Sequence, residues 1–124
     1  MKKFENFQAA LRNLKDIYSY QEPYGNVVIT GMVGLYEICF EQSWKAMKEI
    51  LETHGYAEGA TGSPRMILKT AYKAGMITDE ELWISALVSR NNVAHAYNEN
   101  LDDLKKAAVD KKYCEQLLKE YGIE

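Results

Sequence analysis

The 124-residue sequence lacks the features of cross-linked and membrane-embedded proteins, because it has few cysteines and no long apolar run. Its two cysteines, Cys39 and Cys114, lack metal-binding and disulfide-framework spacing, and both fall among apolar helical positions. They are therefore interpreted as buried thiols of a reducing compartment. No apolar run approaches the roughly 20 residues that span a bilayer, and the first residues lack the apolar core of a signal peptide. We expect a cytoplasmic protein with no membrane partner.

Charge of either sign is also not in strong excess. The chain has 15 basic and 18 acidic residues, a formal net charge of −3, so it has no general attraction for nucleic acids or anionic membranes. Any polyanion would need a local basic site. Clustered Asp, Glu and His side chains are missing as well, so neither a metal site nor a cofactor is expected.

Sustained alternation of apolar and polar residues, internal repeats and low-complexity tracts are all lacking, which argues against strands and repeats. Apolar residues instead recur at spacings of three and four, as on helices with one buried face. We therefore predict a single all-α domain over residues 1–124. The expected architecture is an antiparallel up-and-down bundle of about five helices with a four-helix core, and it is expected to be dimeric.

The predicted helices are bounded by turn and capping residues. They cover about residues 4–20, 27–53, 64–74, 79–90 and 102–121, and the small-residue stretch 56–62 is predicted to be a flexible loop. Ser63 and Pro64 are typical of a helix start, and Gly55 and Gly75 of helix ends. A capping box is predicted at Thr78–Glu81, in which the Thr78 hydroxyl accepts a hydrogen bond from a backbone amide and the Glu81 side chain reaches back. The third helix is expected to bury Met66, Ile67, Ala71 and Tyr72.

The stretch from Arg90 to Tyr97, Arg-Asn-Asn-Val-Ala-His-Ala-Tyr, carries the most chemistry. It is predicted to form the exposed end of the fourth helix and the turn after it. His95 can take or give a proton near neutral pH, and the forked donors of Arg90 suit a phosphate. Together they fit metal-independent cleavage of RNA by its own 2′-hydroxyl. The alternative is a surface ion pair for Arg90 and a helix-capping role for His95.

Helical geometry limits how Arg90 and His95 can act together. Five residues apart on a regular helix, they would lie about 140° apart and would not converge within one chain. Convergence requires either that the helix ends near Asn92 or that a second chain supplies part of the site. The spacing therefore favours a site assembled across a homodimer.

Arg90-Asn91-x-x-x-His95 is similar to the signature of the HEPN superfamily, and its extension to Tyr97 resembles that of the HepT toxins, also described as nucleotidyltransferase substrate-binding proteins. Further segments match that family in order. They are Phe40-Glu41-Gln42-Ser43-Trp44-Lys45, Ser63-Pro64-Arg65, Tyr72-Lys73-Ala74-Gly75 and Trp83.

The resemblance implies a metal-independent ribonuclease acting on RNA rather than DNA. Arg90 would hold the scissile phosphate, His95 would be the acid or base, and Asn91 would be the polar companion that orients both side chains. A minimal nucleotidyltransferase encoded nearby, an MntA-type antitoxin, would transfer AMP to Tyr97 and so block the cleft. Packing alone is the alternative for Tyr97. A non-catalytic adaptor that presents or receives the substrate of that enzyme is the alternative function.

Other residues are given lesser roles. Glu41, Trp44 and Lys45 are candidates for the cleft or the dimer face, with core packing as the alternative for Trp44. His54 is interpreted as complementing the C-terminus of its helix. Arg65, Lys69 and Lys73 share one helix face, which is interpreted as solvated surface, with contact to RNA or the partner as the alternative.

Overall fold

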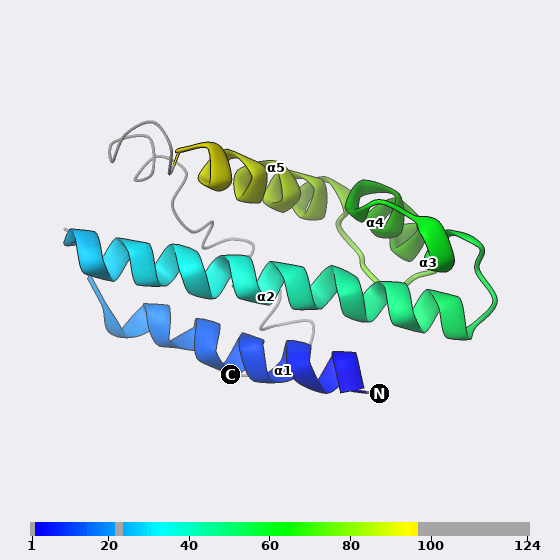
Figure 1. Cartoon of the computed structure of the whole chain (residues 1–124), viewed down its shortest axis with the longest axis horizontal. Helices are drawn as coiled ribbons and strands as arrows, with labels where there is room; N and C mark the ends of the chain where they lie inside the picture. Colours follow the sequence, from blue (N-terminus) through cyan, green and yellow to red (C-terminus); the bar gives the residue numbers. More distant parts are fainter. Residues whose placement is uncertain (1, 22–23, 97–124) are drawn as a thin grey trace.

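The computed structural model describes residues 2–21 and 24–96, and every regular element within these ranges is a helix (Figure 1). The elements are α1 (Lys2–Leu14), the 3₁₀ helix η1 (Lys15–Ser19), α2 (Asn26–Thr53), α3 (Glu58–Thr61), α4 (Pro64–Lys73) and α5 (Glu80–Ala96). The all-α prediction is therefore confirmed. The helix predicted over residues 102–121, with Cys114, lies outside the described residues.

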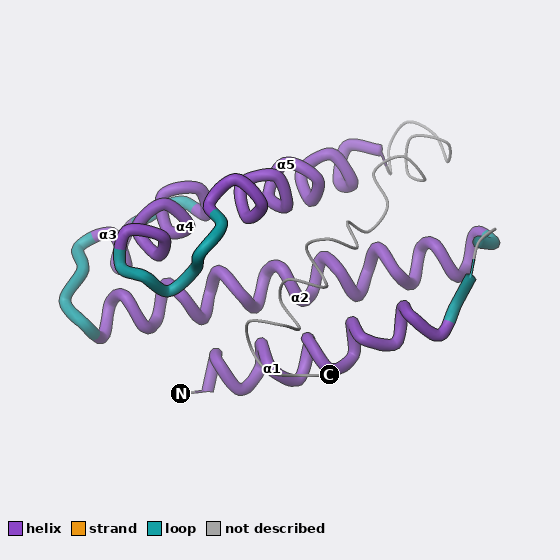
Figure 2. Tube along the Cα trace, turned by 180° about the vertical axis from the view of Figure 1, so that it is seen from behind, coloured by secondary structure: helices purple, strands orange, loops and turns teal. Residues whose placement is uncertain are grey.

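The longest helix, α2, lies at the centre of the fold. Its 28 residues correspond to about 42 Å of helix. Figure 1 shows α1 along one side of α2 and α4 with α5 along the other, and the view from behind in Figure 2 agrees. The three long helices α1, α2 and α5 run antiparallel in turn, as expected for an up-and-down bundle.

The core between α1 and α2 is built from apolar residues at helical spacing. On α1, Phe7, Leu11 and Leu14 are at most 2% exposed, and α2 faces them with the broad apolar surface that its sequence predicts. Tyr18 continues the spacing of Phe7, Leu11 and Leu14, which predicts that it faces inward, but this prediction is wrong because its side chain is 40% exposed. The chain tightens into η1 after Leu14, and three residues per turn place Ile17 over the core instead.

The ends of the helices largely follow the predicted signals. The Ser63 hydroxyl accepts a hydrogen bond from the backbone N–H of Met66, and Pro64 begins α4. Gly55 and Gly75 adopt φ values of +84° and +80°, the left-handed conformation that ends a helix. The helix α5 begins at Glu80, and the Asp79 carboxylate before it accepts a hydrogen bond from the N–H of Leu82 at 3.1 Å.

Two predictions about the middle of the chain are wrong. The stretch 56–62 is not a free loop but contains α3, where Gly59 is buried so closely against Glu52 that a Cβ there would collide with its backbone. On α4, Met66 and Tyr72 are 48% and 45% exposed rather than buried. Only a narrow stripe of α4 packs inward, formed by Ile67, Leu68 and Ala71, and the two exposed residues fall outside it.

Candidate functional site

Arg90 of α5 contacts Glu41 of α2, although 49 residues separate them in the sequence. Nη2 of Arg90 donates to Oε1 of Glu41, which makes an ion pair between the two helices. The side chains are 33% and 24% exposed, so water still reaches the pair. The sequence placed both residues among the candidates, and the structure brings them into direct contact.

Glu41 uses its second oxygen to hold a tryptophan. Trp44 lies one turn later on α2, and its indole Nε1–H donates to Oε2 of Glu41 at 3.2 Å. Because both carboxylate oxygens are engaged, the orientation of Glu41 and hence of the Arg90 guanidinium is restricted. Trp44 is half-buried and therefore supports this contact as well as the core, whereas Lys45 is exposed next to it.

Asn91 is in contact with Arg90 as well. Nη1 of Arg90 donates to Oδ1 of Asn91 at 3.2 Å, and Asn91 is exposed. The guanidinium thus lies between a carboxylate on α2 and an amide on α5. The role of orienting companion expected for Asn91 stays a prediction.

Tyr36 is a positioning residue that the sequence did not reveal. Its hydroxyl donates to the backbone carbonyl of Ala86 at 2.8 Å, and this bond is buried. Ala86 lies one turn before Arg90 on α5, so the bond fixes that turn against α2. The sequence could not indicate it, because Tyr36 has the spacing of an ordinary core residue.

Glu37 is a second carboxyl close to the ion pair. It lies one turn before Glu41 on the same face of α2 and is half-buried. Burial raises the pKa of the Glu37 carboxyl above 4.5, the nearby positive charge of Arg90 opposes this, and the negative charge of Glu41 adds to it. The spacing of four residues from Glu41 was the available signal, and sequence analysis missed it.

The helix α5 does not end near Arg90, as was predicted, but continues to Ala96. His95 is therefore a helical residue, five positions after Arg90. On a regular helix these positions lie about 140° apart, so a single chain does not direct both toward one point. Tyr97 lies outside the described residues.

Other reactive groups of the described residues do not form a site. The described residues contain no group of three metal-binding side chains, and none of their helices is long and apolar enough to cross a membrane.

Cys39 is fully buried, which raises the pKa of its thiol to about 12. Nδ1–H of His54 donates to the backbone carbonyl oxygen of Ile50 at 2.9 Å, at the end of α2. Its predicted capping position is confirmed.

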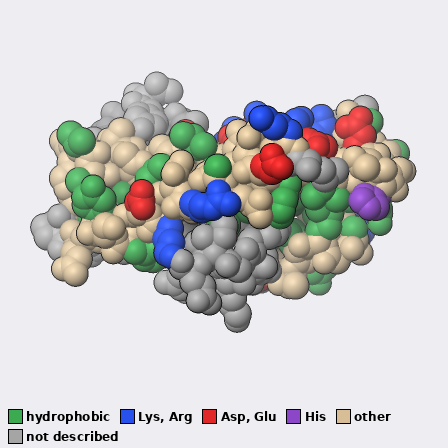
Figure 3. Space-filling model, turned by 90° about the horizontal axis from the view of Figure 1, so that it is seen from below, with side chains coloured by type: hydrophobic (Ala, Val, Ile, Leu, Met, Phe, Trp, Pro, Cys, Tyr) green, Lys and Arg blue, Asp and Glu red, His purple; other side chains and the backbone are tan. Residues whose placement is uncertain are grey.

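The molecular surface has mixed charge. Figure 3 shows basic and acidic side chains intermixed over the described part of the face seen there, without a broad basic region. Any attraction for a polyanion on this face must therefore be local.

A family model described as "nucleotidyltransferase substrate binding protein like" matches residues 2–121, nearly the whole chain. This match confirms the resemblance that the ordered motifs indicated. No curated protein matches the sequence significantly.

Proposed function

The chain belongs to the nucleotidyltransferase substrate binding protein-like family, and from this premise we propose that it is a toxin-type, metal-independent ribonuclease. In this proposal it acts as a homodimer and is neutralised when a partner nucleotidyltransferase attaches AMP to Tyr97. The observation that carries the proposal is the partly exposed guanidinium of Arg90, held in place by Glu41 and Asn91.

An oriented guanidinium is what RNA cleavage requires of a cation. The 2′-hydroxyl loses its proton to a base, its oxygen bonds to phosphorus, and the 5′-oxygen leaves and takes up a proton. Negative charge builds on the phosphorane oxygens, and a fixed Arg90 stabilises it without reorganising during the reaction. His95 moves a proton in one of these two transfers.

A second chain supplies the missing geometry. Because α5 is regular through Ala96, positions 90 and 95 of one protomer diverge. In a twofold dimer, Arg90 of one chain can meet His95 of its partner. The homodimer is thus part of the proposed mechanism and not merely a mode of assembly.

Modification of Tyr97 would act on the same region. Its phenol oxygen would attack the α-phosphorus of ATP, the phenolic proton would be lost, and pyrophosphate would leave. The attached nucleotide would be a bulky anion two residues from His95. Its charge would repel RNA phosphates and its volume would fill the approach to Arg90.

The proposal is tested with purified protein and RNA in the presence of a metal chelator. We expect cleavage that falls by at least about 100-fold in Arg90→Ala and in His95→Ala. The matched control is His54→Ala, which removes the only other histidine and is expected to cleave normally. Cleavage that survives His95→Ala would contradict the proposal. Intact mass after co-expression with the neighbouring nucleotidyltransferase, followed by peptide mapping, tests addition of AMP to Tyr97.

A non-catalytic adaptor is the second candidate, and one observation favours it. The positive charge of Arg90 is already balanced by Glu41, and Glu37 adds a second carboxyl nearby. An incoming phosphate therefore meets competing negative charge. Stable co-purification with a nucleotidyltransferase, with no RNA cleavage by the free protein and an unmodified Tyr97, would support the adaptor.

A further inference from the structure

The helix α4 carries a local excess of positive charge. Its ten residues include Arg65, Lys69 and Lys73 and no carboxylate, in a chain whose net charge is −3. All three cations are exposed, and within the part of the chain that the structure describes none of them forms an ion pair. Because their charges are not balanced by a neighbour on the helix, they remain available to an anionic ligand.

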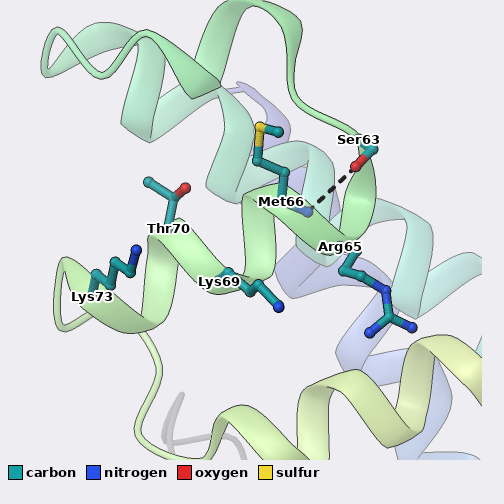
Figure 4. Close-up of a pocket in the computed structure, with 6 residues that line it drawn as sticks. All are labelled: Ser63, Arg65, Met66, Lys69, Thr70 and Lys73. Atoms are coloured by element: carbon teal, nitrogen blue, oxygen red, sulfur yellow. Dashed lines mark hydrogen bonds between the residues drawn. The ribbon is translucent and has the colours of Figure 1, made fainter.

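The three cations form a row along α4. They follow each other every four residues, which corresponds to about 6 Å between successive positions. Figure 4 shows the three side chains lined up along the helix, beside a shallow surface groove that Ser63, Met66 and Thr70 also line. A row of this kind can follow the regularly spaced phosphates of an extended nucleic acid strand.

Apolar side chains flank this row. Met66 and Tyr72 lie on α4 on either side of the cations and are 48% and 45% exposed. An exposed aromatic ring beside cations is the combination that binds single strands, since a base can stack on the ring while its phosphate meets a cation. Both residues were predicted to be buried but are exposed. Their exposure is a second feature, besides the row of cations, that points to a single-stranded nucleic acid.

A groove connects the row of cations on α4 to α5, and one face of α5 leads from this groove to the candidate site. Arg65 and Lys69 line a second groove together with Ile84 and Ser85 of α5, although Glu80 and Glu81 also line it and reduce its positive potential. From Ile84, the half-exposed Val88, the exposed Asn91 and position 95 follow at spacings of four, three and four. These positions share one face of α5, and about 17 Å of helix separates the first from the last.

We propose that the exposed face of α4, formed by Arg65, Lys69, Lys73 and Tyr72, binds single-stranded RNA and guides it onto the face of α5 that carries Asn91 and position 95. This inference rests on the proposed function for its substrate. An acidic surface of the partner nucleotidyltransferase is the competing ligand. Two features favour RNA. One is the exposed Tyr72, and the other is the face of α5 through positions 84, 88, 91 and 95 that continues from α4. Charge pairing with a protein would require neither.

The test measures RNA binding separately from cleavage. Full-length protein carrying His95→Ala, which keeps the RNA intact, is titrated with a fluorescent single-stranded RNA at several salt concentrations. Removing the three charges with Arg65→Gln, Lys69→Gln and Lys73→Gln should lower affinity roughly 100-fold at about 0.1 M salt. The plot of log affinity against log salt should become shallower by about 2, at roughly 0.7 per phosphate contact. Tyr72→Ala should lower affinity roughly tenfold without changing that slope.

The matched control removes three exposed charges from α1 and η1, on the other side of α2, with Lys3→Gln, Arg12→Gln and Lys15→Gln. It should bind RNA like the His95→Ala protein. No measurable RNA binding by that protein, or equal losses in both triple variants, would overturn the proposal. It would also be overturned if the α4 variant kept its RNA affinity but lost capture of the nucleotidyltransferase. RNA binding through α4 by a wild-type protein that does not cleave would uphold this inference and contradict the proposed nuclease.

Discussion

The two interfaces of α2 are held together by different kinds of contact. Against α1 the contacts are apolar, with Phe7, Leu11 and Leu14 almost completely buried. Against α5 the apolar core of Trp83, Ala86 and Leu87 is joined by the Tyr36 hydroxyl bond and by the ion pair of Arg90 with Glu41. Among the described candidate residues, Glu41, Arg90 and Asn91 lie at or near the second interface.

The two interfaces therefore make different contributions: one mainly stabilises the fold, and the other orients the Arg90 side chain. Apolar burial is strong but not directional, so the α1/α2 interface can supply most of the folding free energy without fixing any one side chain. Hydrogen bonds and partly exposed ion pairs contribute little net free energy but impose direction. The α2/α5 interface therefore holds Arg90 in a defined orientation, and substitutions at the two interfaces should differ in kind.

The largest expected effect is the loss of apolar contact at the α1/α2 interface. Leu11→Ala deletes a side chain that is 0% exposed and should lower the free energy of unfolding by about 2–5 kcal/mol. Urea unfolding followed by circular dichroism measures it. The exposed neighbour Asn13→Ala is the control and should change stability by no more than about 0.5 kcal/mol. A loss for Leu11→Ala no larger than that of the control would refute the assignment of stability to this interface.

A smaller effect is expected at the α2/α5 interface from Tyr36→Phe. This change removes only the hydroxyl that donates to the backbone carbonyl of Ala86, so the free energy of unfolding should fall by about 1 kcal/mol. Hydrogen exchange should rise in α5 around Ala86 more than in α1, because the bond anchors that turn. Tyr20→Phe, at a position 51% exposed, is the matched control. Equal behaviour of the two variants would show that the bond does not fix α5.

The sequence predicted the fold well wherever a local signal decides the structure. Ser63, Gly55 and Gly75 act at the helix boundaries through their own backbone or side-chain chemistry, and all three predictions are confirmed. The two apolar rows of α2 likewise follow from spacing alone. The burial predictions for Tyr18, Met66 and Tyr72 failed because they depend on how much of each helix its neighbours cover.

The candidate site was predictable only as a set of residues. Glu41 and Arg90 were both identified, but their contact joins two helices and no spacing along the chain contains it. The continuation of α5 to Ala96 was missed for a different reason. Its amides and β-branched residue favour a helix end locally, whereas helix propensity is weak enough to be overridden by the surrounding structure.

The smallest expected effect concerns Glu37 and depends on pH. Burial, reinforced by Glu41 and opposed by Arg90, raises the pKa of Glu37 above 4.5 in the folded chain. The folded chain then binds this proton more tightly than the unfolded chain. Its stability therefore falls as pH rises from about 4.5 through the folded pKa, and it stays lower above that range.

Glu37→Gln removes this ionisable group while keeping its shape. The variant should be slightly more stable than the wild type at neutral pH, and the gain should vanish below about pH 4.5. Glu41→Gln is the contrasting change, because it weakens the partner of Arg90 and should destabilise the chain by no more than about 1 kcal/mol at neutral pH. Thermal unfolding of both variants from about pH 3.5 to about pH 8 measures these effects. A Glu37→Gln protein less stable than the wild type at neutral pH would mean that attraction to Arg90 outweighs the cost of burial, and both carboxylates would then hold the guanidinium.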